Sequence, residues 1–157
     1  MSQVIEESDV TAVNLAIELE RAVIEHGLSE DESIYVTEDG WFPFWIRVLK
    51  GAGYVSFKTH TEFKKATSRL QKLEICNELN KTKYLVTCYE ADDRICFDHV
   101  LNFRDGLLRE NFVRTCRQFS KVVEMGLHEA DPENDFVLLP GQTEAEDETG
   151  DQEQGNA

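Results

Sequence analysis

The side chains of this sequence that could do chemistry are four cysteines and four histidines. No two cysteines form a C-x-x-C pair, and no two histidines stand at zinc-ligand spacing, so no metal or cofactor site is predicted. Each cysteine has apolar neighbours, among which a free thiol behaves as a small hydrophobe. We therefore expect buried or half-buried thiols. The cysteines are Cys76, Cys88, Cys96 and Cys116, and the histidines are His26, His60, His99 and His128.

His99 is the histidine that falls inside an expected strand, on the face that also carries Phe97 and Leu101. Its neighbour Asp98 points to the opposite face because side chains alternate along a strand. The pattern favours a packed histidine over a catalytic dyad. An enzyme that uses His99 or a free thiol such as Cys96 is the rival hypothesis. Cys88 and Cys96 could face each other across a hairpin, although a reducing compartment argues against a disulfide.

Two short motifs resemble ligand loops only superficially. The sequence Gly51-Ala52-Gly53 lacks the third glycine and the lysine of nucleotide-binding loops. The pair Asp92-Asp93 lacks the ligands that a calcium loop spreads over about twelve residues. Both motifs are predicted to be turns between strands.

An aromatic run, 41–46, is a candidate protein-binding strand. Alternation places Phe42, Phe44 and Ile46 on one face, and Trp41, Pro43 and Trp45 on the other. Only one face of a single-layer sheet can meet the helices of its own chain, and exposed large aromatics are typical of interfaces. The binding candidates are Trp41, Phe44 and Trp45. Alternatively, other elements cover both faces.

A basic stripe follows one face of the last expected helix, with Arg114, Arg117 and Lys121 at i, i+3 and i+7. A second basic group, on the preceding helix, comprises Lys64, Lys65, Arg69 and Lys72. One interpretation is a solvated helix face. The other is a docking surface for acidic groups from a partner, from the tail of this chain, or from a second subunit.

Charge is unevenly distributed along the 157 residues, whose net charge is −15. Residues 1–40 contain eleven acids and one base, 41–129 contain eleven acids and fifteen bases, and 130–157 contain nine acids and no base. The ends would repel nucleic acid, and only the mildly basic middle would not.

No run of about 20 apolar residues predicts a membrane span, and the N-terminus lacks the pattern of a signal peptide. A cytoplasmic location is expected.

Hydrophobic periodicity predicts an α+β domain over residues 1–141 and a disordered acidic tail over 142–157. The expected order is α-β-β-β-α-β-β-α, with helices on an antiparallel sheet. Helices are expected at 9–26, 61–80 and 107–127, and strands at 33–38, 41–49, 54–58, 84–90 and 94–103. A short apolar segment, 136–139, is expected to dock on the body.

Capping residues and a buried set of residues can be assigned to the expected helices. The first is capped by Ser8 or Asp9 and ends at Gly27. The second begins at Thr61, and its buried stripe comprises Phe63, Ala66, Leu70 and Leu73, extended by Asn77 and Asn80. The third buries Leu108, Phe112, Thr115, Phe119 and Val122.

The helix that ends in Asn77 and Asn80, the hairpin after it, and the Gly106-Leu107 break before a helix with Phe112 and Phe119 form a familiar series. This series resembles the YbjN family of putative bacterial sensory transduction regulators, in which an N-x-x-N pair ends such a helix. The resemblance implies a bacterial source and a fold like that of type III secretion chaperones, which are small, acidic, dimeric and non-enzymatic and hold unfolded client segments. Fold alone does not establish chaperone activity.

Asn77 and Asn80 are the residues that the resemblance carries over. Their amides could cap the last carbonyls of the helix or the turn into Tyr84, and we expect a structural role. The expected function is that of a homodimeric, non-enzymatic regulator or chaperone-like adaptor that binds a protein. The alternatives are the small enzyme described above and a regulator linked to nucleic acid, which would need the basic middle to act despite the acidic ends.

Overall fold

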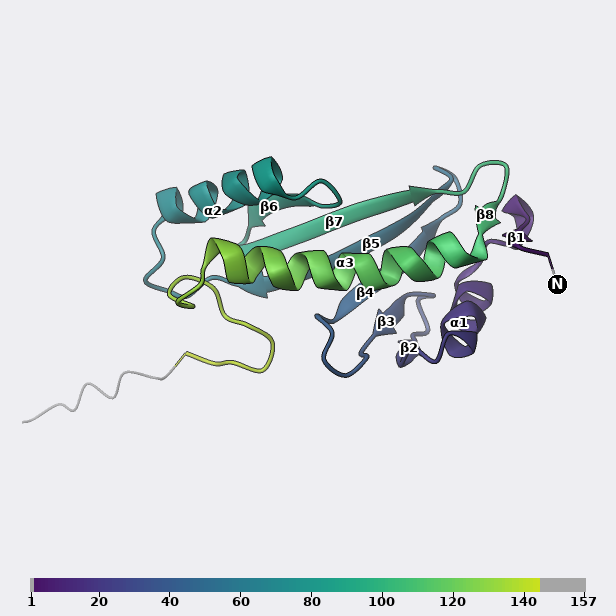
Figure 1. Cartoon of the computed structure of the whole chain (residues 1–157), viewed down its shortest axis with the longest axis horizontal. Coiled ribbons are helices and arrows are strands. Elements are labelled where there is room, and N and C mark those ends of the chain that lie inside the picture. Colours follow the sequence, from purple (N-terminus) through teal and green to yellow (C-terminus); the bar gives the residue numbers. More distant parts are fainter. Residues whose placement is uncertain (1, 145–157) are drawn as a thin grey trace, which may run out of the picture.

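The computed structural model describes residues 2–144 and has the predicted α+β class (Figure 1). Within these residues, three helices lie beside the main antiparallel sheet: α1 (Ala12–Arg21), α2 (Arg69–Thr82) and α3 (Arg109–Ala130). The chain begins with a two-residue strand and a single 3₁₀ turn, β1 (Val4–Ile5) and η1 (Glu7–Asp9). In the described part of the chain, no helix is long and apolar enough to cross a membrane.

The main sheet has six strands in the order β2-β3-β4-β5-β7-β6. They are β2 (His26–Leu28), β3 (Ile34–Val36), β4 (Phe44–Leu49), β5 (Tyr54–Glu62), β6 (Thr87–Ala91) and β7 (Arg94–Asn102). The predicted turns at 51–53 and 92–93 are confirmed, since Gly53, Asp92 and Asp93 all have positive φ. β5 and β7 pair along nine residues each, so they form the centre that carries the other strands.

The core lies between this sheet and α3, which runs across one sheet face (Figure 1). Phe119 of α3 meets the ring of Phe44 edge-on at 5.3 Å and the ring of Phe57 at 5.9 Å. The ring of Phe112, two turns earlier on the same face of α3, has its centroid 6.2 Å from that of Phe57. Aromatic rings in such offset arrangements pack closely and remove much apolar area from water. The predicted stripe of α3 is confirmed for Phe112, Thr115 and Phe119, which form the main wall of the core, whereas Val122 is only half-buried.

The first helix is shorter than predicted. α1 is capped by Thr11, whose hydroxyl accepts a hydrogen bond from the Asn14 amide at 3.1 Å, and it ends at Arg21. Val23, not Gly27, takes the left-handed conformation after it, with φ of 58°. The reason is tertiary, because the reversal buries Ile24 and lets β2 add to the sheet edge beside β3.

The second helix begins later than predicted, at Arg69, because β5 continues to Glu62 along the full length of β7. Ser68 caps α2 in a capping box with Gln71. Its buried residues are Ile75, Cys76 and Leu79, whereas Leu70 and Leu73 are exposed, so the predicted stripe was wrong. Apolar residues lie on more than one side of this helix, and periodicity alone chose the wrong side.

The N-terminal segment closes one end of the molecule in a way that the sequence did not predict. β1 pairs with a short strand before α3, β8 (Leu107–Leu108). Leu108, which was predicted to be buried on the helix, is therefore on this strand and exposed. The carboxylate of Glu18 on α1 is buried and forms salt bridges with Arg109 and Arg21. These contacts use Arg109 internally rather than as part of a free basic surface.

The C-terminal segment after α3 docks on the body, as predicted for 136–139. We call residues 132–140 the strap. Val137 forms an isolated β-bridge with Phe63, and Leu138 donates to the Glu62 carbonyl at 2.8 Å. Thr67 donates to the Phe136 carbonyl at 2.9 Å. The strap is therefore fixed to the end of β5 and to the loop before α2.

Candidate binding surfaces

The sheet face opposite the helices carries the first candidate surface, which we call the open face. Trp45 of β4 stacks on Tyr35 of β3, with ring centroids 4.3 Å apart and planes at 27°. Trp45 stays 40% exposed. Other large side chains on this face are also exposed: Leu49, Tyr54, Tyr89 and Val100. The open face is thus an apolar and aromatic surface on a rigid sheet.

Phe44 does not belong to that surface. It is fully buried against Phe119, because its position on β4 faces the helices. Trp41 and Pro43 are not on the strand at all, since β4 begins only at Phe44. The predicted alternation across 41–46 therefore holds from Phe44 onward, and the aromatic run divides between the core, the open face and a loop.

Polar side chains on the open face are held by local bonds. The carboxylate of Asp31 accepts hydrogen bonds from Ser29 and Ser33 and pairs with Arg47. The Ser29 hydroxyl, with Arg47 next, lowers the pKa of Asp31 to about 2. Arg47 on β4 is thereby fixed beside Trp45.

Asp98 forms the second polar group of the open face. Its Oδ2 lies 3.5 Å from the Lys58 ammonium and accepts a hydrogen bond from the Tyr89 hydroxyl at 3.2 Å. Its Oδ1 is buried and has no hydrogen-bond partner among the described residues. Burial and the charge of Asp98 raise the pKa of Tyr89 to about 12. A carboxylate oxygen buried without a donor is costly, so the ionised form of Asp98 is held at some expense in stability.

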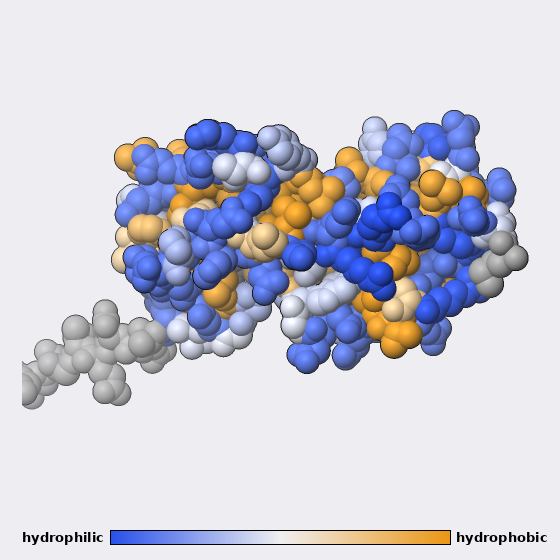
Figure 2. Space-filling view, viewed as in Figure 1, coloured by the Kyte–Doolittle hydropathy of each residue, from blue (hydrophilic) through white to orange (hydrophobic). Residues whose placement is uncertain are grey.

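The second candidate surface is a groove of about 530 Å³ beside the last turns of α3. Three segments line it: the loop before β4, the last turns of α3, and the strap. The surface is hollowed where the loop and the strap approach α3 (Figure 2). Its lining residues are mostly apolar and include Trp41, Phe42, Leu127, Val137, Leu139 and Pro140.

Specific hydrogen bonds shape the walls of the groove. The buried carboxylate of Asp131, at the end of α3, accepts backbone hydrogen bonds from Asp135, Phe136 and Val137 at 2.7–2.9 Å. On the opposite wall, the Phe42 amide donates to the Ser120 hydroxyl at 2.8 Å. Because both walls are tied to α3, the groove is preformed.

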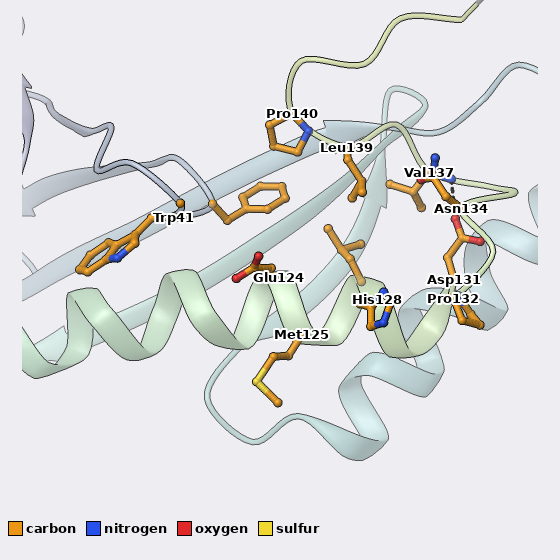
Figure 3. Close-up of a pocket in the computed structure, with 13 residues that line it drawn as sticks. Trp41, Glu124, Met125, His128, Asp131, Pro132, Asn134, Val137, Leu139 and Pro140 are labelled. Carbon is orange, nitrogen blue, oxygen red and sulfur yellow. Dashed lines mark hydrogen bonds between the residues drawn. The ribbon is translucent and has the colours of Figure 1, made fainter.

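The groove has an acidic character. The carboxylate of Glu124 points from α3 into the space between Trp41 and Leu139 (Figure 3). Among the described residues, no lysine or arginine nitrogen lies within 4 Å of it. Acids also flank the lining segments in the chain: Glu38, Asp39, Glu133 and Asp135.

The predicted basic stripe on α3 is exposed along its length. Arg114 pairs with Glu110 one turn earlier at 2.6 Å, while Arg117 and Lys121 extend into solvent. Exposed pairs of this kind contribute little to stability. The lysines around the start of α2 are largely engaged: Lys72 pairs with Asp93 at 2.5 Å, and Lys64 donates to the Asn134 carbonyl.

The beginning of the acidic tail contacts this second basic group. The carboxylate of Glu144 accepts a hydrogen bond from the Lys65 amide at 2.5 Å and lies 3.8 Å from the Lys65 ammonium. Gln142 also bonds the strap, through Asn134 and Leu139. The predicted disorder of 142–157 is therefore wrong for 142–144, which are attached to the body, and 145–157 lie outside the described residues.

The two asparagines of the N-x-x-N pair are placed differently. The Asn80 amide exchanges two hydrogen bonds with the backbone of Cys88, each 2.8 Å long. Its partner is thus the edge strand β6, not the helix carbonyls or the turn into Tyr84. Asn77 is exposed one turn earlier. A structural role for Asn80 remains a prediction that mutation can test.

The residues of the rival enzyme hypothesis are not brought together. His99 packs 5.7 Å from the Phe57 ring on the helix side, and burial lowers its pKa. Asp98 lies on the opposite sheet face. Cys88 and Cys96 do not face each other either, because Cys88 pairs with Phe97 and Cys96 with Tyr89 in the hairpin.

The four cysteines are free, and Cys76, Cys88 and Cys116 are buried. Burial raises the pKa of Cys116, and burial together with Asp98 raises that of the half-buried Cys96. A hydrogen bond between the two thiols raises the pKa of Cys88 and lowers that of Cys76, both inside the core. A thiolate nucleophile needs access and a low pKa together, and no cysteine has both.

Within residues 2–144, no three potential ligands cluster in a way that could hold a metal ion.

Comparison with known proteins gives a consistent result. Residues 11–131 match the model of the family YbjN, described as a putative bacterial sensory transduction regulator. A solved structure with the same fold is described as "Crystal structure of YbjN, a putative transcription regulator from E. coli". It superposes with a TM-score of 0.66 at 17% sequence identity, over 80% of this chain and 94% of that chain. No curated protein sequence matches this chain.

Proposed function

Because the chain belongs to the YbjN family of putative bacterial sensory transduction regulators, we propose that it is a non-enzymatic, cytoplasmic regulator that binds other proteins and acts as a homodimer. The observation that supports this most strongly is the open face, where Trp45 and Tyr35 are stacked and exposed on a rigid sheet. Aromatic side chains fixed in this way lose little conformational freedom on binding, which favours their use as interface anchors.

A second copy of the chain is the occupant that this face suits best. A two-fold contact places one surface against itself, so it must be self-complementary. Acids and bases alternate across the open face as Asp31 with Arg47 and Asp98 with Lys58. The buried Oδ1 of Asp98 also lacks a donor within the described chain. A two-fold contact would bury the exposed apolar residues of this face, and the charge pairs at its edges could exchange partners between the two copies.

Regulation through direct contact with nucleic acid has less support. Binding to phosphates needs cations that are free to neutralise them. Arg47 and Lys58, which lie on the open face, are paired with acids. Arg104, which closes the far end of the sheet, is paired with Glu7 at 2.5 Å. Arg117 and Lys121 of α3 extend into solvent, but the net charge of −15 would repel nucleic acid from the chain as a whole. Protein binding is therefore the better hypothesis, and a chaperone-like adaptor would use the same faces.

The test of this proposal is the mass of the protein in solution, measured by analytical ultracentrifugation at micromolar concentrations. The wild-type protein should sediment as a dimer, and Trp45→Glu should sediment as a monomer with an unchanged circular dichroism spectrum. Leu70→Glu is the matched control, since Leu70 is 65% exposed on α2, away from the open face, and this variant should remain dimeric. A monomeric wild type, or a dimeric Trp45→Glu variant, would contradict the proposal.

A further inference from the structure

We propose that the groove between the strap and α3 is a docking site for an extended protein segment that is both apolar and basic. The segment inserts an apolar side chain between Trp41 and Leu139, and its lysine or arginine pairs with Glu124. This inference rests on the proposed protein-binding function, but it is independent of the open face and of dimer formation.

The size and construction of the groove suit a short segment. A volume of about 530 Å³ lies in the range of sites that bind small molecules, or two to three side chains of a peptide. Its floor consists of the buried residues Phe42, Leu127 and Val137. Because Asp131 and Ser120 already fix both walls, binding would require little reorganisation of this chain.

The apolar character of the ligand follows from the walls. Leu139 is 38% exposed although it faces the groove, and Trp41 is only half buried. Pro140 extends the same wall. A ligand side chain between these residues would remove their apolar surface from water, which is favourable by roughly 25 cal/mol per Å² buried.

The basic character of the ligand follows from charge. Glu124 is the carboxylate that points into the groove, and no lysine or arginine among the described residues forms a salt bridge with it. His128, one turn later on α3, also lines the groove and forms no salt bridge with Glu124, and the Lys64 ammonium is engaged by the Asn134 carbonyl of the strap. Lys121 lies one turn earlier on α3, where its positive charge reduces the negative potential of the groove, but it does not pair with Glu124. An acidic ligand, including the acidic tail of this chain, would be repelled from the groove.

Recognition would take place through side chains rather than by strand addition. The backbone amides of the strap are already used: those of 135–137 donate to Asp131, that of Leu138 donates to Glu62, and that of Leu139 donates to Gln142. A ligand segment therefore finds no free row of donors with which to form a β-ladder.

The test uses three fluorescein-labelled octapeptides and the full-length protein. The first has the sequence Ser-Lys-Leu-Phe-Lys-Leu-Ser-Gly, the second replaces both lysines with glutamate, and the third replaces Leu-Phe and the second Leu with serines. Anisotropy should show that the first binds and that the other two bind at least about tenfold more weakly. In NMR spectra of the protein, the first peptide should change the chemical shifts of the Trp41 indole and of the Leu139 methyl groups.

Variants decide whether the binding occurs in the groove. Glu124→Gln should weaken binding of the first peptide about tenfold, whereas the control Glu129→Gln, whose carboxylate pairs with Lys83 instead, should not. Leu139→Ser should also weaken binding of the first peptide. Its free energy of unfolding should stay within about 0.5 kcal/mol of the wild type, as is usual for surface substitutions. The inference is overturned if no peptide binds, if the acidic peptide binds equally well, or if the shifts appear at Trp45. The last result would leave the proposed protein-binding function intact, and Trp45→Glu tests the dimer separately.

Discussion

The side-chain amide of Asn80 pairs with the backbone of Cys88 as a neighbouring strand would, donating to its carbonyl and accepting from its amide at 2.8 Å each. Cys88 lies on β6, the edge strand of the sheet, and Asn80 lies on the last turn of α2. The asparagine therefore covers one unpaired position of an edge and fastens α2 to it.

Asn80→Ala should destabilise the protein because it leaves both backbone groups of Cys88 without their partner. Groups of this kind cost about 1–3 kcal/mol when they are left unsatisfied. Urea unfolding followed by circular dichroism measures the change. The matched control is Asn77→Ala, since Asn77 is exposed on the same helix and should stay within about 0.5 kcal/mol of the wild type. Unchanged stability of Asn80→Ala, combined with weaker partner binding, would show that the role is functional and not structural.

The strap depends on Asp131, whose carboxylate accepts three consecutive backbone amides. Asp131→Ala removes a charged acceptor from a buried position and should cost about 3 kcal/mol. Hydrogen exchange followed by mass spectrometry should show faster exchange at 135–137 than in the wild type. Glu133→Ala, an exposed acid in the same segment, is the control and should leave exchange unchanged. Equal protection in both variants would mean that the contacts of Val137 and Leu138 with β5 suffice to hold the strap.

Asp31 makes a pH-dependent contribution. The Ser29 hydroxyl and then Arg47 lower its pKa from 3.8 to about 2 in the folded protein. A depressed folded pKa means that the stability contributed by Asp31 is present above pH 4 and is lost as the pH falls towards 2. Carbon-detected NMR titration of Asp31 should give a midpoint near 2, and Ser29→Ala and Arg47→Met should each raise it. Glu30→Gln is the control, and a midpoint of 3.8 in the wild type would rule out these bonds in solution.

Several features were predictable because they depend on neighbouring residues. The hairpin between β6 and β7 and the long helix α3 follow from alternation and from a helical period that adjacent positions set. The end of α1 was mispredicted because Val23 adopts a left-handed conformation that favours glycine, and the packing of Ile24 compensates for it. The side of α2 that is buried depends on where β6 lies, and local sequence does not contain that information.

The candidate surfaces divide in the same way. Trp41 and Trp45 could be singled out from their type and position as candidate binding residues. Phe44 was wrongly grouped with them because its facing partner, Phe119, lies 75 residues away in the chain. The groove residues Leu139 and Glu124 had no signal beyond the short apolar segment that contains Leu139. They acquire a common role only when the strap folds back onto α3.

The sequence by itself determined the α+β class, the series of elements shared with the family, and the absence of a catalytic motif, since periodicity and residue spacing are properties of short stretches of chain. Tertiary structure alone decided which aromatic residues are buried, which acids find bases, and where a groove forms. These outcomes depend on contacts such as those of Asp131 with the strap and Ser120 with Phe42. The second of these joins residues 78 apart, which no pattern of adjacent residues encodes.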